Sequence, residues 1–433
     1  MSNNSELCET LNFELLSRTK KGRPKKPKFL AIDFFCGAGG TTRGLIDADG
    51  YVLAGVDKVT TCARTYLRNN GNETWDRDYP VFLDMDIFPK SEEYPQGQQH
   101  KIEESLDVIV ARAREKYPDV PLCLAICAPC QPFTAMSHGM SEQRVEKRSS
   151  DRSLLMHASQ FVERYQPEYV LSENVAGISK QRFGGVWQEF MDELDKIGYV
   201  VGSSLICASN FGIPQRRRRS ILAGVRSDLF DEPPSKLVVP QSDPEAKAIS
   251  VEAALKGLPK LGAGASDPSV PNHLSRGLND INLRRITYAP AGGSNSYLEN
   301  TPEGDLSLPC HNRVNSKFGQ RCFGDSYTRM APDEVSPTIT TKCHSFTNGR
   351  FGHHDVSQKR CISMREAARL QSFKDDYIFY PENQLTSVAT QIGNAVPPKL
   401  ASFFMNYLLS SISDLSGSGR KKRLDPKTHH SSF

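Results

Sequence analysis

The sequence predicts an α/β protein in which a doubly wound, mostly parallel sheet is joined to a second, smaller and irregular domain. Through residue 225, short apolar runs of strand length alternate with stretches whose apolar residues recur at helical spacing. From about residue 226 to 335 this periodicity disappears, and Pro, Gly, Ser and Asn become frequent. That stretch is too long for a plain loop in a compact domain, which predicts a separate irregular unit.

The predicted strands are short apolar runs of the kind that parallel strands form when both faces are buried. They cover residues 28–35 (KFLAIDFF), 51–57 (YVLAGVD), 120–127 (VPLCLAIC), 167–175 (PEYVLSENV), 200–207 (VVGSSLIC) and 220–225 (SILAGV). In such a sheet the active groups lie in loops after the carboxyl ends of the strands. The notable polar and glycine residues of this sequence follow these strand ends.

The predicted helices are recognised by apolar residues three and four positions apart. They cover residues 102–117, 153–165, 186–199 with Gly198 as a stop signal, 363–373 and 397–412. In the last of them one apolar face is expected, formed by Leu400, Phe403, Phe404, Tyr407 and Leu408.

Five segments follow from these patterns. They are a disordered basic arm (1–27), a catalytic core (28–225), an irregular domain (226–335), a stretch that completes the core (336–413) and a disordered tail (414–433). The arm ends in KKGRPKK, which resembles an AT-hook for the minor groove of A·T-rich DNA. The alternative interpretation is a solvated basic tail.

Composition sets limits on the kind of protein. The 433 residues contain 54 Lys and Arg against 50 Asp and Glu, so positive and negative charges nearly balance. Binding of a polyanionic partner would therefore need a local basic surface. No apolar run is long enough to span a bilayer, and no signal peptide is apparent. The 11 cysteines are an odd number, which favours reduced thiols. We therefore expect a cytoplasmic protein, associated with the nucleoid if bacterial, without a metal site and monomeric.

Glycines and carboxylates follow the first strands. In the stretch DFFCGAGG, Gly37 and Gly39 would let a nucleotide-like cofactor approach the backbone, or they would only make a tight turn. Asp57 and the pair Asp86–Ile87 follow two further strands. A carboxylate at such a strand end often binds the ribose hydroxyls of a cofactor. In a related role, a carboxylate binds the amino group of the adenine. The alternative is a solvated loop carboxylate.

Three cysteines lie close together in CLAICAPCQPFTAMSHG, residues 123–139. A redox dithiol would need Cys127 and Cys130 at a helix N-terminus, but the sequence after them predicts a mobile loop. A zinc site would need further ligands at suitable spacing, and none follows. Cys123 and Cys127 fall within the apolar run of the strand, which predicts small core residues. Cys130 lies beyond the strand end, where a single nucleophile is chemically sensible.

Two further polar motifs follow. Glu173 in SENV, at a strand end, could hold or protonate a base. In PQRRRRS, Arg217 and Arg219 share one face of an extended chain, and Arg216 and Arg218 share the other. One pair could point into a site, or all four could form a solvated or backbone-binding patch.

Taken together and in this order, these motifs resemble the C5-cytosine DNA methyltransferase family. The resemblance covers residues 29–225 and 336–413, nearly the whole chain outside the tails and the variable segment. The matching stretches are DFFCGAGG, APCQPFT, SENV, PQRRRRSILAGV with Gln215, Arg217 and Arg219 in register, SPTITT, REAARLQSF and QIGNAVPP. Seven motifs in family order are not a chance match.

The resemblance implies a role for each motif. S-adenosylmethionine would be bound by residues of the early and late motifs: Asp33, Phe35, Gly37, Gly39, Asp57, Asp86, Ile87, Asn394 and Val396. Cys130 would attack C6 of a flipped cytosine, Glu173 would bind N3 and the amino group, and Arg219 would hold the carbonyl oxygen. Arg217 would support that site. Residues 226–335 would read the sequence of double-stranded DNA as a target-recognition domain.

The sequence departs from the family pattern at the cofactor ribose. The family often has Glu two residues before Asp after the second strand, but here Gly55 stands at the Glu position. Asp57 or Asp33 would then make the ribose contact.

The resulting hypothesis is a Rossmann-like DNA (cytosine-5-)-methyltransferase, in a restriction-modification system with a cognate endonuclease or acting alone. The alternatives are a tRNA cytosine-C5 methyltransferase of the same family, a non-catalytic DNA-binding relative and a dithiol oxidoreductase that would need Cys127.

Overall fold

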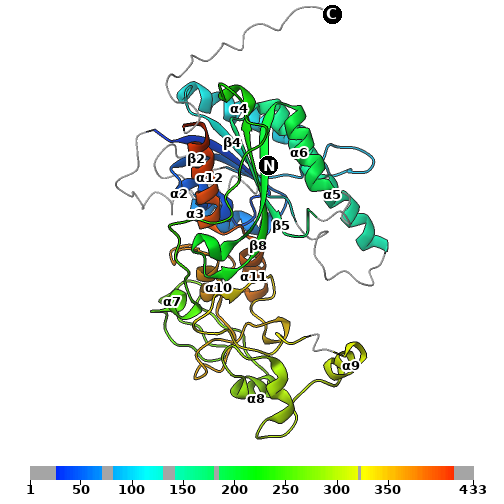
Figure 1. Cartoon of the computed structure of the whole chain (residues 1–433), viewed down its shortest axis with the longest axis vertical. Coiled ribbons are helices and arrows are strands. Elements are labelled where there is room, and N and C mark those ends of the chain that lie inside the picture. The colour runs from blue at the N-terminus through cyan, green and yellow to red at the C-terminus, as the bar shows by residue number, and fades with distance from the viewer. Residues whose placement is uncertain (1–25, 71–80, 130–141, 180–184, 320–322, 414–433) are drawn as a thin grey trace, which may run out of the picture.

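The structure is a computed structural model of the chain that describes residues 26–70, 81–129, 142–179, 185–319 and 323–413. Figure 1 shows an upper lobe built around a sheet and a lower lobe of short helices and loops, with α10 and α11 where the two lobes meet.

The upper lobe is organised by a seven-stranded sheet with the order β3-β2-β1-β4-β5-β8-β6. Neighbouring strands are parallel from β3 to β5, and β8 is antiparallel to β5 and to β6. This confirms the predicted doubly wound, mostly parallel sheet. The strands are β1 (Phe29–Phe34), β2 (Gly50–Asp57), β3 (Val81–Asp84), β4 (Leu122–Ile126), β5 (Tyr169–Val175), β6 (Tyr199–Cys207) and β8 (Arg218–Arg226).

The strand order reverses between β1 and β4. From β1 the chain moves outward through β2 to β3, and it then returns to place β4 on the other side of β1. Loops that leave the carboxyl ends of β1 and β4 therefore diverge and leave a crevice for a ligand. The register fixes this point, because Phe34 pairs with Ile126 at the ends of the two strands.

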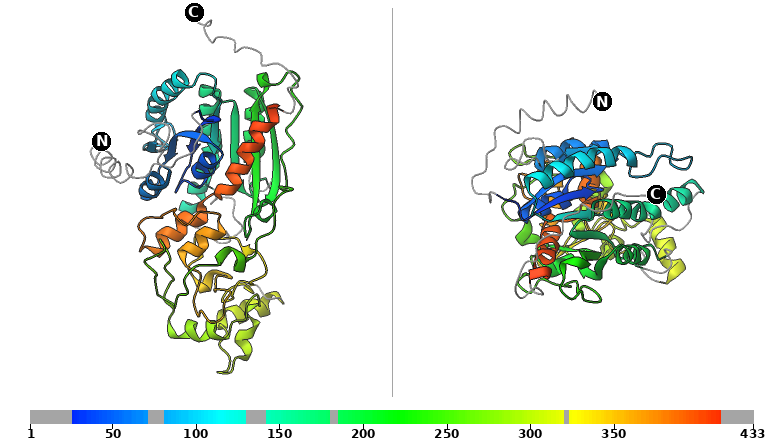
Figure 2. Two further views of the ribbon diagram at one scale, coloured as in Figure 1. Left: turned by 90° about the vertical axis from the view of Figure 1, so that its left-hand side faces the viewer. Right: turned by 90° about the horizontal axis from the view of Figure 1, so that it is seen from above.

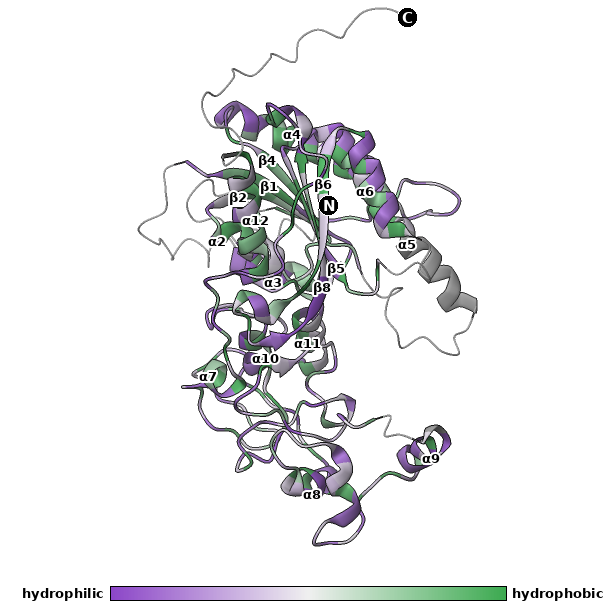
Figure 3. Cartoon of the chain, in the orientation of Figure 1, coloured by the Kyte–Doolittle hydropathy of each residue, from purple (hydrophilic) through white to green (hydrophobic). Residues whose placement is uncertain are grey.

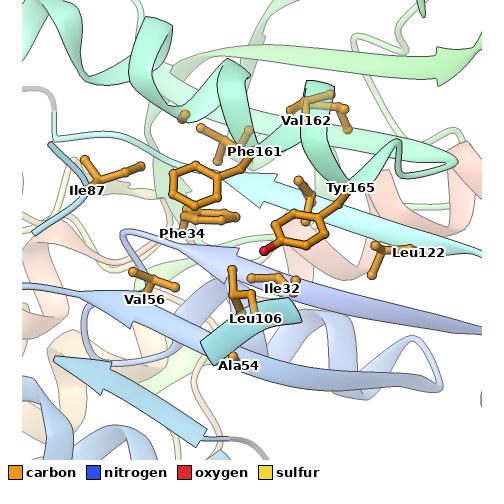
Figure 4. Packing of buried hydrophobic residues seen from close by; sticks show 14 of the residues in the cluster. Ile32, Phe34, Ala54, Val56, Ile87, Leu106, Leu122, Phe161, Val162 and Tyr165 are labelled. Atoms are coloured by element: carbon orange, nitrogen blue, oxygen red, sulfur yellow. The ribbon is translucent and has the colours of Figure 1, made fainter. Parts of the chain in front are cut away.

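Helices cover both faces of the sheet (Figures 1 and 2). On one face lie α4 (Gln99–Lys116), α5 (Glu142–Tyr165) and α6 (Val186–Lys196), and on the other lie α2 (Gly40–Asp47) and α12 (Pro398–Ser413), with α3 (Ala63–Asn70) beside β3. Figure 4 shows the first interface, in which the rings of Phe34 and Phe161 lie 4.9 Å apart. Figure 3 shows the strands as mostly apolar and the outer helix surfaces as polar.

Every residue of β1 is buried, as the continuous apolar run predicts. Leu30, Ile32 and Phe34 pack under α4 and α5, while Phe29 and Ala31 face α2 and α12. Burying each large side chain stabilises the fold by about 1.5–3 kcal/mol. The central strand therefore holds both helical layers in place.

The last helix of the chain completes the core of the first strands. The predicted apolar face is confirmed: Leu400, Phe404 and Leu408 are fully buried and Phe403 and Tyr407 pack partly buried beside them. The helix lies so close to α2 that a side chain at Gly44 would meet the backbone of Pro398 at 2.3 Å.

The remaining elements build the lower lobe and its junction with the sheet. They are the short parallel pair β7 (Gln215–Arg216) and β9 (Ser336–Pro337), and the helices α7 (Val251–Leu255), α8 (Asp280–Tyr288), α9 (Pro309–Phe318), α10 (Met364–Leu370) and α11 (Leu385–Asn394). The 3-10 turns are η1 (Thr60–Cys62), η4 (Ala208–Phe211), η5 (Ser227–Leu229), η6 (Asn295–Asn300) and η7 (Phe346–Asn348).

Two sequence-based expectations about element ends were wrong. Helix α5 begins at Glu142 rather than near residue 153, because its first turns are polar and carry no apolar period. Strand β4 ends at Ile126, so Cys127 lies just after the strand and is half-buried rather than in the core. Cys123 is buried as expected.

Candidate active site

The carboxyl ends of β1, β4 and β5 and the start of β8 meet at the edge of the sheet that faces the lower lobe (Figure 1). The loop after β1 turns sharply there, and Phe35, Gly37 and Gly39 all have positive φ, with values of 60°, 50° and 88°. A side chain at Gly39 would also lie 2.1 Å from the amide nitrogen of Asn70. The turn therefore requires glycine, as the GAGG stretch predicts, and Phe35 adopts a conformation that is costly for a bulky residue.

Asp33 is a fully buried carboxyl at the end of β1. Its Oδ2 accepts hydrogen bonds from the backbone N–H and the hydroxyl of Thr42, at 3.0 and 2.6 Å, whereas its buried Oδ1 has no partner among the described residues. Burial raises the pKa of Asp33 from 3.8 to about 7, with a smaller contribution from the charge of Asp57. The site thus contains an unsatisfied acceptor directed into the protein, which costs free energy unless a donor fills it.

Asp57 binds the glycine-rich loop. Its Oδ2 accepts from the N–H of Gly37 at 2.8 Å and its Oδ1 accepts from the N–H of Val59 at 2.7 Å. Burial raises the pKa of Asp57, and these two backbone donors oppose that rise. The carboxylate therefore holds the loop in its conformation at the end of β2.

The structure explains the glycine at position 55. A side chain there would lie 2.5 Å from the ring of Tyr66 and 2.7 Å from the sulfur of Cys36. The space that the family's glutamate would occupy is thus filled by the Tyr66 ring, whose hydroxyl accepts from Thr42 at 3.2 Å. A glutamate at this position is excluded, and Asp57 is the carboxylate that remains at the end of β2.

Asp86 and Ile87 lie just beyond β3. The Asp86 carboxylate is 3.3 Å from the ammonium of Lys58 and accepts from the N–H of Phe88, and its side chain is 21% exposed. Ile87 is buried in the core under α4 and α5. No hydrogen bond or ion pair within the described residues connects this pair to Glu173 or Arg219.

Glu173 and Arg219 form a buried ion pair, with Oε1 and Nε 2.8 Å apart. The two residues come from adjacent antiparallel strands, in which Val175 pairs with Arg219. Arg219 also donates from Nη1 to the carbonyl of Arg218 at 2.7 Å. Each side chain is only 11% exposed, so each charge depends on the other or on a polar ligand for its solvation.

The alternating arginines lie as the extended pattern predicts. As whole residues, Arg217 and Arg219 are 3% and 9% exposed and are therefore buried, whereas Arg216 and Arg218 are exposed. Arg217 does not point toward Glu173; its guanidinium donates to the carbonyls of Ile339, Gly393 and Ala395 at 3.2–3.3 Å.

A pair of glutamines supports the same segment. Gln215 donates to the side chain of Gln371 at 2.8 Å and accepts from the N–H of Ile339. Gln371 in turn donates to the carbonyls of Ile392 and Ala395, at 2.7 and 3.4 Å. Sequence reasoning did not single out Gln371 as a functional residue, although it lies in the REAARLQSF motif. The available sequence signal was the polar glutamine that follows the apolar residues of this short motif.

The segment after α11 closes over the strand ends. Asn394 is exposed, while Val396 is 8% exposed and lines a narrow crevice together with Thr41, Cys127 and Glu173. The crevice has a volume of about 10 Å³, room for about one water molecule. It joins residues from the glycine-rich helix, the cysteine motif, the glutamate motif and the late motif.

Cys127 is the thiol that the described site contains. Its sulfur accepts a 3.8 Å contact from the Thr41 hydroxyl, and burial followed by the charge of Glu173 raises its pKa well above the ordinary value. It therefore stays protonated at neutral pH and is a poor nucleophile. Cys130 lies outside the described residues.

Metal-binding groups and membrane-spanning helices were searched for in the described residues. No group of three or more His, Cys, Asp or Glu side chains that could hold a metal ion occurs in the described ranges. None of the helices in that part of the chain is long and apolar enough to cross a membrane.

Related proteins were identified from sequence and structure. M.HgiDII, a Type II methylase of Herpetosiphon aurantiacus, is 33% identical over 371 residues, which are 85% of this chain and 92% of that protein. M.DdeI, a Type II methyltransferase of Desulfomicrobium norvegicum, is 25% identical over 417 residues, 86% of each protein.

The structural relatives share the fold. A prophage-encoded protein of E. coli superimposes with a TM-score of 0.59 at 20% identity, covering 90% of this chain and all of that one. The Entamoeba histolytica methyltransferase EhMeth gives a TM-score of 0.54 at 14% identity, covering 89% of this chain and 98% of that one. Residues 29–410 match the family described as C-5 cytosine-specific DNA methylase. The chain therefore belongs to the C-5 cytosine-specific DNA methylase family.

Proposed function

We propose that this chain transfers a methyl group from S-adenosylmethionine to C5 of a flipped cytosine within a specific sequence of duplex DNA. The observation that carries this proposal is the buried Glu173–Arg219 pair, which lies beside a crevice lined by the glycine-rich helix and by Val396. A donor and an acceptor held together in a dry site match the polar edge of a base.

The cofactor fits the residues at the ends of β1 and β2. S-adenosylmethionine carries a cationic ammonium and ribose hydroxyls, and the unpartnered Oδ1 of Asp33 and the carboxylate of Asp57 are acceptors for such donors. The positive-φ turn from Phe35 to Gly39 brings the backbone close to a ligand. Asp86, Ile87, Asn394 and Val396 would enclose the remainder. When bound, the cofactor supplies an electrophilic methyl group on a sulfonium.

Glu173 and Arg219 would bind the cytosine edge. Arg219 donates to the carbonyl oxygen, and Glu173 accepts from the exocyclic amino group and, when protonated, donates to N3. Negative charge builds up on N3 and the carbonyl oxygen when a nucleophile adds to C6. Groups already aimed at those atoms stabilise that charge without reorganising. In the free protein the two charges neutralise each other.

Cys130 would be the nucleophile. A thiolate of Cys130 would form a bond to C6, and the electrons of C5=C6 would then make C5 nucleophilic toward the methyl group that bound S-adenosylmethionine would supply. A base then removes the C5 proton, and the C6–S bond breaks to regenerate the thiolate. The raised pKa of Cys127 argues against that thiol as the nucleophile.

The substrate is proposed to be duplex DNA rather than tRNA. The sequence relatives M.HgiDII and M.DdeI are Type II enzymes, which favours a restriction-modification system with a partner endonuclease. Residues 226–335 would be the target-recognition domain and 336–413 would complete the catalytic core. We propose a monomer that works in the cytoplasm on the nucleoid.

Methyl transfer from labelled S-adenosylmethionine to duplex DNA and to bulk tRNA tests this function. We expect incorporation into DNA alone, loss of transfer in Cys130→Ser, and retained transfer in the control Cys127→Ala. Bisulfite sequencing of DNA from expressing cells gives the modified site. Transfer that survives Cys130→Ser, or that requires Cys127 equally, would rule out this mechanism.

A further inference from the structure

The side chain of Tyr377, which follows α10 in the sequence, reaches the glycine-rich turn after β1. Its hydroxyl donates to the carbonyl of Ala38 and accepts from the side-chain amide of Asn70 at 3.0 Å. Tyr377 is buried, and so is Asn70. Burial raises the pKa of Tyr377, so the hydroxyl keeps the proton that it donates. A residue far along the chain is thus bonded to the turn that begins the cofactor site.

The Tyr377 hydroxyl fixes one peptide group of this turn. The carbonyl of Ala38 and the N–H of Gly39 belong to the same peptide group, and that N–H donates to the carbonyl of Cys36 at 2.8 Å. Both ends of the group are therefore bonded, and rotating it would break both hydrogen bonds. The turn needs such support, because Phe35 has a φ of 60°, a conformation that is costly for a bulky residue.

Tyr377 and Asn70 also pack directly against the turn. A side-chain carbon at Gly39 would lie 2.1 Å from the amide nitrogen of Asn70 and 2.9 Å from the hydroxyl oxygen of Tyr377. Contacts this close leave the turn no room to move toward these two groups. The carboxylate of Asp57 holds the same turn through the N–H of Gly37 at 2.8 Å. The turn is therefore held between the end of β2 and the segment that follows α10.

The backbone that carries Tyr377 is itself fixed by polar side chains. Arg365, which is fully buried, donates from Nη2 to the carbonyl of Tyr377 at 2.6 Å. Asn69 on α3 donates to the carbonyl of Ile378 at 2.7 Å and accepts from the N–H of the same residue at 2.8 Å. The hydroxyl is therefore already in place in the free protein, and cofactor binding need not order it.

We propose that Tyr377 is a positioning residue for S-adenosylmethionine, whose hydroxyl holds the peptide group between Ala38 and Gly39 so that the turn keeps the shape that the cofactor binds. The inference rests on the function proposed above. The aromatic ring has a separate, structural role, since it packs on Phe373 and Phe379 with ring centres 4.7 and 5.2 Å apart. Phenylalanine at position 377 would keep this packing and lack only the hydroxyl, so the two roles can be separated.

Calorimetric titration with S-adenosylmethionine, without DNA, tests this role. Tyr377→Phe leaves the carbonyl of Ala38 without its donor, and we expect the dissociation constant of the cofactor to rise roughly 5- to 30-fold. In methyl transfer to the cognate duplex, identified by bisulfite sequencing, KM for the cofactor should rise likewise, while kcat changes by less than about twofold. A merely structural loss would lower the active fraction, and hence kcat, without changing KM.

The matched control is Tyr199→Phe. The hydroxyl of Tyr199 also belongs to a buried tyrosine and donates to a backbone carbonyl, that of Pro167 at 2.6 Å. Tyr199 pairs with Arg226, at the end of β8 that lies away from Arg219. The control should therefore lower the melting temperature about as much as Tyr377→Phe does, and it should leave the dissociation constant of the cofactor unchanged.

Asn70→Ser is a second variant, which removes the amide that orients the hydroxyl and leaves Tyr377 in place. It should raise the dissociation constant by a smaller factor, and it decides the question if Tyr377→Phe does not fold. A wild-type dissociation constant in the folded variants overturns the proposal, and so does an equal rise in Tyr199→Phe. A wild-type chain that binds S-adenosylmethionine but methylates no duplex refutes the proposed reaction alone, and one that binds no cofactor refutes both.

Discussion

Asp33 shows how one buried residue can connect cofactor binding to stability. Its Oδ1 has no partner in the described protein, and burial raises its pKa to about 7. Burying such a carboxyl lowers the stability of the fold, and a bound cation would remove that penalty. Functional sites often retain groups of this kind, because the ligand completes what the protein leaves unsatisfied.

The stability contributed by Asp33 should fall as pH rises. Between 3.8 and about 7 the folded chain keeps a proton that the unfolded chain has released, so the free energy of unfolding decreases with pH in that window. The slope is at most about 1.4 kcal/mol per pH unit. Asp33→Asn can still accept from Thr42 and should flatten this slope, measured by urea unfolding at pH 5 and pH 7.

The control for this measurement is Asp231→Asn, which changes an exposed carboxyl and should keep the wild-type slope. A slope in Asp33→Asn equal to that of the wild type would show that Asp33 is not protonated in the folded protein at pH 5.

The surroundings of Gly55 show what the sequence could not decide about single residues. The sequence alone left Asp57 and Asp33 as equal candidates for the ribose contact. Only the packed structure shows that the Tyr66 ring occupies the position of the missing glutamate, and that Asp57 faces the glycine-rich loop. A contact between residues 55 and 66 from different elements has no local sequence signal.

At the scale of elements, the short pair β7–β9 and the helices α10 and α11 are held together by buried amides and a guanidinium. Gln215, Arg217 and Gln371 together bind separate backbone groups of Ile339, Ile392, Gly393 and Ala395. The result is that the segment carrying Val396 is positioned by residues from three separate motifs. We propose that the late motifs act on the site by fixing this loop.

Gln371→Ala should weaken this support. The change leaves the amide of Gln215 short of one buried partner and frees the carbonyl of Ile392, at a cost of about 1–3 kcal/mol for each unsatisfied group. We expect a lower free energy of unfolding and a several-fold weaker affinity for S-adenosylmethionine, measured by urea unfolding and by calorimetry.

Gln384→Ala is the matched control, because Gln384 is an exposed glutamine at the start of α11 whose side chain does not cap the helix. It should change neither quantity. Wild-type cofactor affinity in Gln371→Ala would mean that the amide network supports the fold without positioning the loop.

Most strands and helices of the upper lobe were predictable, and so was α10 at its junction with the lower lobe, whereas α7, α8 and α9 were not. Strand β1 and helix α12 have strong periodic apolar patterns, and both lie where the sequence predicts them. The helices α7, α8 and α9 are short and separated by long loops, so their few apolar residues give no repeated period. Their conformation depends on tertiary contacts such as the stacking of His311.

At the scale of the whole molecule, the catalytic sheet depends on both ends of the chain. Helix α12 packs on α2 and β8, although nearly the whole chain separates it from α2. It buries Leu400, Phe404, Met405 and Leu408 almost completely. At about 1.5–3 kcal/mol each, these four side chains account for a large share of the 5–15 kcal/mol that typically stabilises a protein.

A chain that ends at residue 396 should therefore fail to fold. It exposes the apolar surface of α2 and β8, and we expect insoluble protein or the loss of a cooperative thermal transition. A chain that ends at residue 413 keeps the whole of α12 and should retain the wild-type melting temperature. A soluble, cooperatively unfolding 1–396 fragment would contradict this account.

The position of α12 also has a consequence for synthesis on the ribosome. The apolar surface of α2 and β8 is made early, but its cover is translated only after the entire lower lobe. The nascent chain must therefore hold a seven-stranded sheet with one face partly uncovered while the lower lobe is made, and in that period the lower lobe can form its own small core. We expect an incomplete chain to be inactive for the same reason, because this face of the catalytic lobe is covered only after α12 emerges.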